Sequence, residues 1–244
     1  MILNKIKTIY GKGLLILVLF AITSNCSDSL DLDPKTTWAA EDFYANESDI
    51  NAAIAGIYSH ISSGNSFGEH VMMMSSGTDE SYKRKDWNDR FPVMSNSHNP
   101  GSEGVTHVWS TFYGGINNAN NMIKFIDPAK FDDEAVYNRY LGEAKFLRGF
   151  FYYHLTCWYN EVPLRLEPSV DQSSNHVAPS PVNEVYEAII ADLEFAAENL
   201  PSSFDSEYIP GHANSGAAHA MLAKTYLKAA GFPLQATEIN GKNP

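Results

Sequence analysis

Hydrophobic residues recur every three or four positions along several stretches of the chain, and this spacing is typical of helices that bury one side. Polar segments with glycine or proline separate these stretches. The pattern predicts an all-α, mainly helical fold with long irregular loops. The expected helices cover about residues 49–63, 105–126, 140–160, 181–200 and 217–230.

The stretch from Tyr140 to Leu164 is expected to form the central helix. Leucine, alanine and aromatic residues line one side, and further phenylalanines and tyrosines widen the apolar surface beyond a single stripe. Other helices must therefore cover it on several sides. Pro163 cannot continue the backbone hydrogen-bond ladder and favours an extended Val162, so the helix is expected to end at about Asn160.

Local residues predict how the other helices begin and end. Ser48 is the expected N-cap of the first helix, and Ser180 followed by Pro181 has the N-cap and N1 pattern of the fourth. The second helix is rich in asparagine, a poor helix former, so this part needs tertiary support or lines something polar. The asparagines are Asn117, Asn118, Asn120 and Asn121. The expected apolar face and C-terminal glycine of the last helix are Ala218, Leu222, Tyr226 and Gly231.

The N-terminal segment has the features of an export signal. A basic start precedes an uncharged, mostly apolar run at residues 13–25, which is too short to span a bilayer comfortably. The run leads to Cys26 in a pattern that resembles a bacterial lipobox, with Asn25 where glycine, alanine or serine is usual. We expect a lipoprotein signal peptide at residues 1–25 and a lipid anchor on Cys26. The alternative is a signal cleaved nearby, with Cys26 as a bystander.

Charge and cysteine content narrow the classes of partner. Removal of residues 1–25 takes away three positive charges and no negative ones, which lowers the formal net charge from −12 to −15. Such an acidic chain is not expected to bind nucleic acid or an anionic membrane surface by charge. Residues 26–38 are acidic and turn-rich, which predicts an extended tether. Cys157 is then the one remaining thiol, so no intramolecular disulfide is expected, and it is interpreted as a small buried residue.

Two patterns bear on catalysis. Residues 64–68 match the G-x-S-x-G nucleophile elbow, but an elbow follows a strand, and here a helix comes first, so Ser66 is interpreted as part of a turn. Acidic pairs at residues 79–89 would suit glycoside hydrolysis only at a carboxyl separation that sequence spacing does not fix. We predict no catalytic residue, no metal site and no cofactor, and we do not expect an enzyme.

A long polar loop at residues 76–104 is the best candidate for ligand binding, because loops of this length are usually functional or disordered. Tyr82 and Trp87 offer aromatic faces for the apolar side of a sugar ring. Asp89 and Arg90 offer bidentate partners for its hydroxyl groups. These four residues are the predicted ligand site. The alternative is that Trp87 anchors the loop to the core while the charged residues are solvated.

Motifs in several helices resemble the SusD/RagB family of surface lipoproteins. The run EAKFLRGFFYYHLTCWYNEVP, residues 143–163, is similar to the family pattern E-A-x-F-L-R-A-x-x-Y-F-x-L-x-x-x-Y-G-x-V-P. It departs at Gly149, where alanine is usual, and at the Asn160-Glu161 pair. Residues 185–201 and 217–231 resemble another family signature and a tetratricopeptide-like helical hairpin. A second pattern, W-x-x-x-Y-x-x-I-x-x-A-N, is matched by Trp109, Tyr113, Ile116, Ala119 and Asn120.

The resemblance implies a tetratricopeptide-like, SusD-like fold and a location on the cell surface, lipid-anchored to the outer membrane. It further implies a protein that binds a glycan or related nutrient and delivers it to a SusC-like TonB-dependent transporter. The resemblance covers residues 26–236, and family members run considerably longer. We therefore expect the N-terminal part of such a protein, with a SusD-like helical domain at residues 39–244.

Two other functions remain open at this point. Grooves between helical hairpins would let the chain act as a tetratricopeptide-like scaffold for peptides or protein partners. An exported hydrolase that uses Ser66 or the loop carboxylates is the other alternative. Neither the identity of the glycan nor the choice between glycan and peptide follows from these residues.

Overall fold

The computed structural model describes residues 43–44, 46–68, 71, 97–169 and 176–231. The described part is helical, with no strand beyond an isolated bridge, and the predicted all-α fold is confirmed. The long helices are α3 (Glu47–Ser62), α5 (Glu103–Phe125), α6 (Glu134–Tyr159), α7 (Val182–Asn199) and α8 (Ser215–Ala230); η1 (Gly64–Gly68) is a short π-type turn and η4 (Pro128–Lys130) a 3₁₀ turn.

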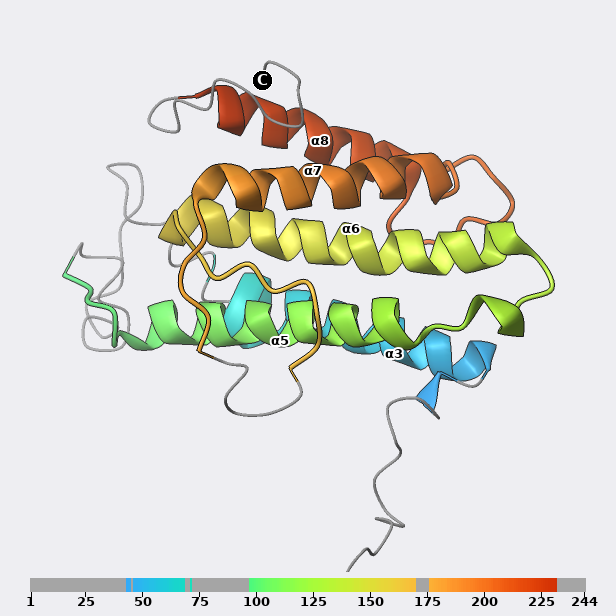
Figure 1. Cartoon of the computed structure of the whole chain (residues 1–244), viewed down its shortest axis with the longest axis horizontal. Coiled ribbons are helices and arrows are strands. Elements are labelled where there is room, and N and C mark those ends of the chain that lie inside the picture. Colours follow the sequence, from blue (N-terminus) through green and yellow to red (C-terminus); the bar gives the residue numbers. More distant parts are fainter. Residues whose placement is uncertain (1–42, 45, 69–70, 72–96, 170–175, 232–244) are drawn as a thin grey trace, which may run out of the picture. The chain divides into compact units, whose positions relative to one another are not determined.

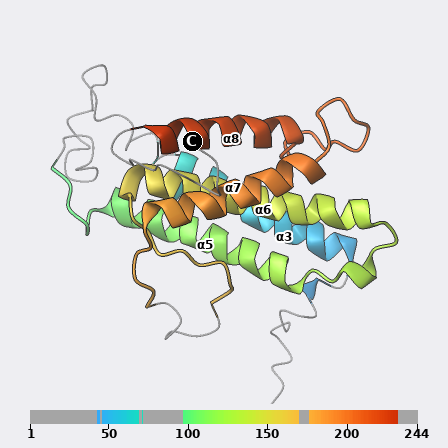
Figure 2. The same ribbon diagram turned by 45° about the horizontal axis from the view of Figure 1, so that its top comes forward.

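Consecutive long helices run antiparallel and stack on one another (Figure 1 and Figure 2). α3 packs on α5, α5 on α6, α6 on α7 and α7 on α8. Each helix therefore finds its main partner next to it in the chain. This is the arrangement of stacked helical hairpins in tetratricopeptide-like folds, in which neighbouring units bury a continuous core.

α6 is the central helix, as its sequence predicts. Half of its 26 residues are buried, on more than one side, because α5 and α7 cover it most extensively. Asp133 caps its N-terminus by accepting a hydrogen bond from the backbone N–H of Ala135 at 2.8 Å. The helix ends at Tyr159, and Asn160 follows with a positive φ of 65°. The predicted end before Pro163 is confirmed.

α5 and α6 approach each other closely at Gly115. A β-carbon at this position would lie 2.5 Å from the ring of Phe151, which is nearer than real atoms come. Because glycine has no β-carbon, that ring can lie against the backbone of α5. Phe112, also on α5, packs on the same ring with centroids 5.3 Å apart. The closest contact of the two helices therefore depends on Gly115.

Two predicted N-caps were wrong, and α6 begins at Glu134, before the expected Tyr140. Asn46, and not Ser48, caps α3: its backbone is extended, and its side chain accepts a hydrogen bond from the backbone N–H of Asp49. α7 begins at Val182, preceded by Pro181. Ser180 lies outside the helix because it pairs with Val162 in an antiparallel bridge. The cap of α3 is thus a local contact two residues before the expected one, whereas the start of α7 depends on a contact with a residue distant in the sequence.

α8 buries only part of the predicted face, of which Ala218 is fully buried as expected. Leu222 and Tyr226 are only partly buried, because a strict spacing of four residues drifts around a helix with 3.6 residues per turn. Gly231 directly follows the last helical residue, as predicted, but its φ of −82° is not the left-handed conformation that is common at such glycines. Its backbone N–H bonds to the carbonyl oxygen of Lys228 and ends the helix without a left-handed residue. The buried residues are Ala218, Met221, Thr225 and Ala229.

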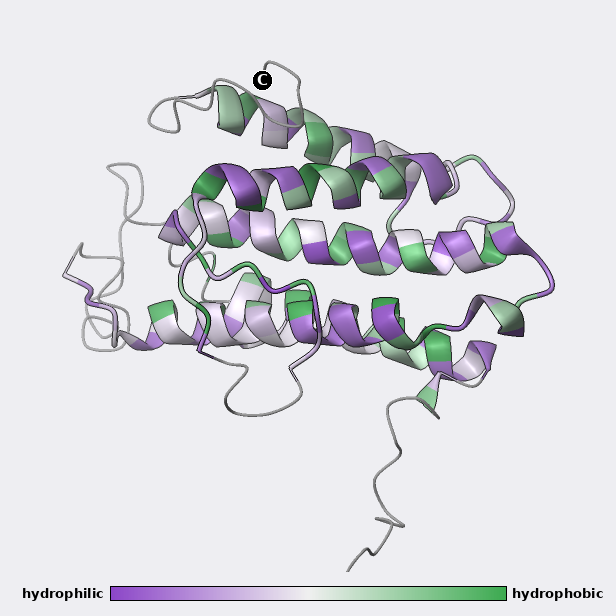
Figure 3. Cartoon of the chain, viewed as in Figure 1, coloured by the Kyte–Doolittle hydropathy of each residue, from purple (hydrophilic) through white to green (hydrophobic). Residues whose placement is uncertain are grey.

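Hydrophobic and hydrophilic residues alternate along all of the long helices, so each presents both kinds of surface (Figure 3). This alternation is typical of helices that bury one side in a protein core. In the part of the chain that the structure describes, none of the helices combines the length and the apolar character needed to cross a membrane.

Candidate functional site

The residues predicted to bind ligand or carry lipid all lie outside the described ranges. They are Cys26, Tyr82, Trp87, Asp89 and Arg90. The acidic pairs at residues 79–89 and the segments expected to be signal peptide and tether also fall outside them. These assignments stay predictions. The described ranges comprise the helical scaffold and the connecting segments that it holds.

Ser66 is not a nucleophile at an elbow. Its side chain is fully buried, and its hydroxyl lies within hydrogen-bond distance of the carbonyl oxygens of His60, Ile61 and Ser63. The end of α3 leaves such carbonyl groups without helical partners. A β-carbon at Gly68 would lie 2.8 Å from the Ser63 oxygen, so the turn also requires glycine there. The G-x-S-x-G run ends a helix, and the turn interpretation is confirmed.

A buried ion pair joins α6 to α7. The guanidinium of Arg148 donates to both carboxylate oxygens of Asp192, from Nε at 2.7 Å and from Nη2 at 2.8 Å. The exposed fractions of the two side chains are 7% and 5%. Nη1 donates to Oδ1 of Asn120 on α5 at 2.8 Å. The planar guanidinium thus makes its bidentate contact with a carboxylate and ties three helices together at one point.

Charge complementarity in this network keeps Arg148 ionised. Burial by itself lowers the pKa of the guanidinium, but the hydrogen bonds and the negative charge of Asp192 more than offset burial and hold that pKa above its ordinary value. A buried charge is tolerated only with such a partner. The pair is therefore a structural element of the core.

The same network holds the irregular segment of residues 162–169, here called the anchored segment, against α5 and α6. Asn120 Nδ2 donates to the carbonyl oxygen of Arg165 at 2.9 Å, and Asn117 Oδ1 accepts from the backbone N–H of Ser169 at 2.8 Å. These contacts satisfy backbone groups that no helix or sheet would satisfy. The expectation that this part of the helix lines something polar is confirmed for Asn117 and Asn120, whereas Asn121 bonds to the Asn117 carbonyl oxygen within the helix.

Tyrosine hydroxyls complete the attachment of the anchored segment. Tyr152 donates to the carbonyl oxygen of Arg165 at 2.9 Å and accepts from the backbone N–H of the same residue at 2.7 Å. Tyr113 donates to the carbonyl oxygen of Pro163 at 2.8 Å. Burial raises the pKa of Tyr152 to about 12, so its hydroxyl stays protonated and able to donate at neutral pH.

A second polar network fixes residues 200–214, here called the α7–α8 connection. The carboxylate of Glu143 on α6 is buried, with 3% of the side chain exposed. The Tyr58 hydroxyl on α3 donates to Glu143 Oε1 at 2.7 Å, and His212 Nδ1 lies 2.7 Å from the same oxygen. The backbone N–H of Ala213 donates to the Tyr58 oxygen at 2.6 Å. One carboxylate thus joins α3, α6 and the connection.

Aromatic rings enclose His154 on α6. The rings of Phe150, Phe67 and Trp158 have centroids 4.6 Å, 4.9 Å and 5.2 Å from the His154 ring. Burial, and then the positive charge of Lys224, lower the pKa of His154 to about 4. The imidazole is therefore uncharged at neutral pH and packs as one more aromatic side chain.

The described part of the chain contains one cysteine thiol, that of Cys157. Cys157 is half-buried and packs against the core, and burial raises the pKa of its thiol, which keeps it protonated. It was expected to be buried, whereas it is only partly covered and packs against the rim of the core. Within the described ranges, no group of three or more histidine, cysteine, aspartate or glutamate side chains is placed to hold a metal ion.

Comparison with known protein families identifies the family to which this scaffold belongs. A SusD-like family model, described as starch-binding and associating with the outer membrane, matches residues 28–227. The chain belongs to the SusD-like family. SusD-like protein P2 from Formosa agariphila is 32% identical over 235 residues, which cover 91% of this chain and 44% of that protein.

Solved structures of the SusD-like family agree with the fold. A SusD homologue from Bacteroides thetaiotaomicron superposes with a TM-score of 0.73 at 27% identity, covering 81% of this chain and 39% of that one. A laminarin-binding SusD-like protein has a TM-score of 0.66 at 29% identity, covering 77% and 41%. The chain thus spans less than half the length of the SusD-like relatives that it matches here.

The motifs shared with the SusD-like family have a structural role in this chain. Arg148 of one motif and Asn120 of another meet in the buried network. Trp109 packs on Tyr113 and Tyr159, with ring centroids 4.9 Å and 5.0 Å away. These residues hold the helices and the anchored segment in place. The motifs therefore contribute to the packing of the SusD-like scaffold.

The departure from the SusD-like pattern at Gly149 has a local explanation. A β-carbon at this position would lie 3.3 Å from Cγ of Leu193 on α7, which is tighter than an ordinary contact. Glycine lets α6 and α7 approach without displacing that leucine. The replacement therefore fits the packing beside the Arg148–Asp192 ion pair.

Sequence reasoning missed the ion pair, although the chain carried a signal for it. Asp192 lies among Ile189, Leu193 and Ala196, on the face of α7 that is otherwise apolar. Charged residues are almost never fully buried unless they are paired. An aspartate on one apolar face and Arg148 on the apolar central helix together predict a buried salt bridge of the SusD-like core.

Proposed function

We propose that this chain belongs to a lipid-anchored cell-surface protein that binds an oligosaccharide and delivers it to a SusC-like TonB-dependent transporter. The observation that carries the proposal is the match of residues 28–227 to a family described as starch-binding and associating with the outer membrane. The similarity to a laminarin-binding SusD-like protein supports carbohydrate as the ligand class. Delivery to a transporter rests on the family resemblance.

The loop residues Tyr82, Trp87, Asp89 and Arg90 are the proposed ligand site. A flat aromatic ring covers the apolar face of a sugar, and carboxylate and guanidinium groups form paired hydrogen bonds with neighbouring hydroxyls. The helical scaffold fixes the ends of the polypeptide on either side of such loops. A rigid scaffold that carries a recognition loop is a common arrangement for binding proteins.

Calorimetric titration with laminarin oligosaccharides, and with a panel of other glycans, tests the site. We expect Trp87→Ala to remove binding while thermal stability stays close to that of the wild type. Lys228→Ala, an exposed change on α8 outside this loop, is the control and keeps the wild-type affinity. Loss of stability in Trp87→Ala with binding retained would identify Trp87 as a core anchor and contradict the assignment.

The proposed domain organisation is a signal peptide at residues 1–25, a tether at residues 26–38 and a helical domain at residues 39–244. A lipidated Cys26 supplies membrane affinity that an acidic globular surface lacks. Labelling cells with a fatty acid analogue tests this step. Label in the wild type and none in Cys26→Ala is the expected result, and an unlabelled wild type would contradict anchoring through Cys26.

A scaffold that binds peptides is the main alternative, because stacked helical hairpins also present concave surfaces to protein partners. The two functions separate in a co-purification with a SusC-like transporter from the same organism. Glycan delivery predicts a stable complex whose glycan affinity depends on Trp87. A complex that forms without glycan binding by either partner would favour the scaffold. Incubation with the same glycans is expected to give no cleavage products.

A further inference from the structure

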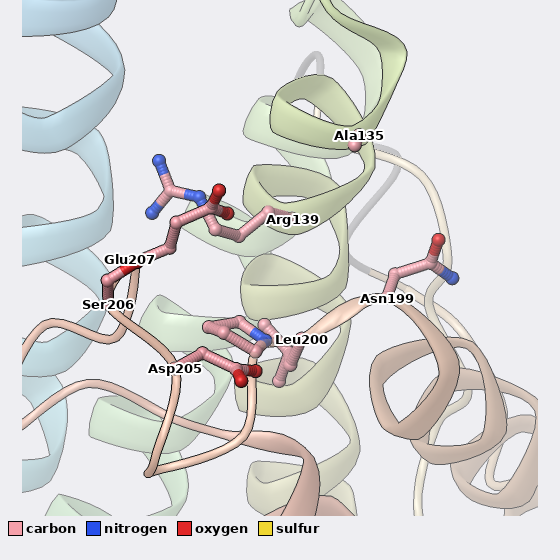
Figure 4. A pocket seen from close by; sticks show the side chains of 8 residues that line it. Ala135, Arg139, Asn199, Leu200, Asp205, Ser206 and Glu207 are labelled. Atoms are coloured by element: carbon pink, nitrogen blue, oxygen red, sulfur yellow. The ribbon is translucent and has the colours of Figure 1, made fainter.

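A pocket of about 360 Å³ lies where the start of α6, the end of α7 and the α7–α8 connection meet. Its volume falls within the roughly 300–1,000 Å³ of pockets that bind small molecules. Leu200 and Pro201 give it an apolar part, and Arg139, Asp205 and Glu207 give it charged groups. Figure 4 shows Arg139 and Glu207 pointing toward one another, with Asp205 beside Leu200.

Contacts with the scaffold hold two of these side chains in position. The guanidinium of Arg139 lies over the Tyr140 ring, 4.3 Å from its centroid. Oδ2 of Asp205 accepts a hydrogen bond from the backbone N–H of Ser202 at 2.6 Å, which leaves the other carboxylate oxygen available to a ligand. Arg139 and Asp205 are thus oriented before any ligand arrives.

The α7–α8 connection that forms the pocket wall is itself well fixed. Backbone bonds run from Asp205 N–H to the Ser202 oxygen at 3.0 Å, from Tyr208 N–H to the Asp205 oxygen at 3.1 Å and from Ser215 N–H to the Pro201 oxygen at 3.0 Å. The Glu143 network holds the far end of the connection. A pre-formed wall lowers the entropy cost of binding.

Phe204 provides the second feature of this site. It directly precedes Asp205 in the connection, and 96% of its surface is exposed. An aromatic ring this exposed is unusual, because burying it would be favourable. The ring is not one of the residues that line the pocket, but it lies on the same connection as Asp205, Ser206 and Glu207, which do. Such a ring offers a face for the apolar side of a sugar ring, while the carboxylates and the guanidinium are suited to hydroxyl groups.

We propose that this pocket and Phe204 form a second carbohydrate subsite, built from residues outside the segment 82–90. The inference rests on the proposed glycan-binding function. The pocket carries two carboxylates and one guanidinium, and the chain has a formal net charge of −12, so neutral sugars bind in preference to uronic acid or sulfated sugars.

Amide NMR of the chain, titrated with laminarihexaose, tests the subsite. We expect the backbone signals of Ser206 and Glu207 to shift in the wild type and in Trp87→Ala. Arg139→Ala and Glu207→Gln are expected to weaken this local response by about tenfold or more, since each removes a charged hydrogen-bond partner. Glu184→Gln, an exposed change at the start of α7, is the matched control and leaves the response unchanged.

The possible results distinguish a failure of the subsite from a failure of the proposed glycan-binding function. Shifts elsewhere in the chain with silent Ser206 and Glu207 signals would overturn the subsite and leave glycan binding in place. If no backbone signal of the chain shifts with laminarihexaose or with any glycan of the wider panel, both the subsite and the proposed glycan-binding function are overturned. Equal responses to laminarihexaose and to an alginate oligosaccharide would contradict the preference for neutral sugars. Thermal melts identify any loss of folding in Arg139→Ala. If that variant is unfolded, the amide shifts of Glu207→Gln, a change on the exposed connection, test the subsite instead.

Discussion

α6 and α8 are both helices rich in apolar residues, yet they occupy opposite positions in the packing. α6 lies between α5 and α7, and half of its residues are buried, including the charged Glu143 and Arg148. α8 packs mainly on α7, and Leu227 on its outer side is 75% exposed. The burial of a leucine or a charged residue in this chain therefore depends on which helix carries it.

The difference follows from how many neighbours cover each helix. A helix enclosed on several sides must satisfy every polar group it carries with protein partners, whereas a helix at the edge leaves such groups to water. Arg148 is accordingly paired with Asp192. The exposed lysines of α8, Lys224 and Lys228, have no such requirement. Substitutions on α6 and its contacts are thus expected to cost far more than those on α8.

Asp192→Ala is expected to have the largest effect, because it leaves the Arg148 charge buried without its partner. Breaking a buried pair from one side costs about 3 to 5 kcal/mol of unfolding free energy. Urea denaturation followed by circular dichroism measures it. Glu198→Ala, which removes an exposed acid from the same helix, is the control and should stay within about 0.5 kcal/mol. Equal costs for the two variants would contradict the enclosed ion pair.

Leu147→Ala tests the enclosure of α6 directly. Leu147 is fully buried, so its truncation is expected to leave a cavity and to cost about 2 to 5 kcal/mol. The same denaturation experiment gives the value. A cost below about 1 kcal/mol would mean that the site collapses around the smaller side chain and that α6 is less tightly enclosed than described.

Acid pH is expected to weaken the aromatic cluster on α6. The pKa of His154 is lowered from 6.5 to about 4, so below pH 6.5 the unfolded chain takes up a proton that the folded side chain refuses. The contribution of the uncharged His154 to the free energy of unfolding is fully present above pH 6.5. It is lost as the pH falls from 6.5 to 4, by an amount on the order of 3 kcal/mol. Urea denaturation across this range compares the wild type with His154→Phe. Identical pH dependence of the two proteins would sink the prediction.

Leu227→Ala on α8 is the smallest expected effect and the counterpart of the leucine change on α6. With 75% of its surface exposed, Leu227 leaves no cavity when truncated, and the cost should stay within about 0.5 kcal/mol. The measurement is again the free energy of unfolding in urea. A cost as large as that of Leu147→Ala would show that α8 is covered in solution by something that the helices described here do not provide.

Hydrophobic spacing was sufficient to place all of the described long helices, because the period of 3.6 residues is a local property of the chain. The end of α6 was equally local: Pro163 removes a donor and stops the helix within a few residues. The turn at Ser66 followed from the helix before it. Each of these features depends on residues that are close neighbours in the sequence.

The candidate site was predictable only in part. The aromatic and charged residues of the loop around Trp87 are an expectation that remains to be tested. The pocket beside Phe204 was not foreseen, because it joins Arg139 to Glu207, which lie on different elements and become neighbours only when α6, α7 and the connection pack. Spacing along one helix carries no information about such a meeting.

The sequence by itself determined the helical fold, the order of its helices and the apolar character of α6, since these depend on spacing within single stretches. The tertiary structure decided which residues meet across stretches: Arg148 with Asp192, Glu143 with Tyr58, and Ser180 with Val162. Partners far apart in sequence leave only a weak local signal, such as one aspartate on an apolar face. Their pairing is fixed by the enclosure that stacked helices create, where an unpaired polar group is costly.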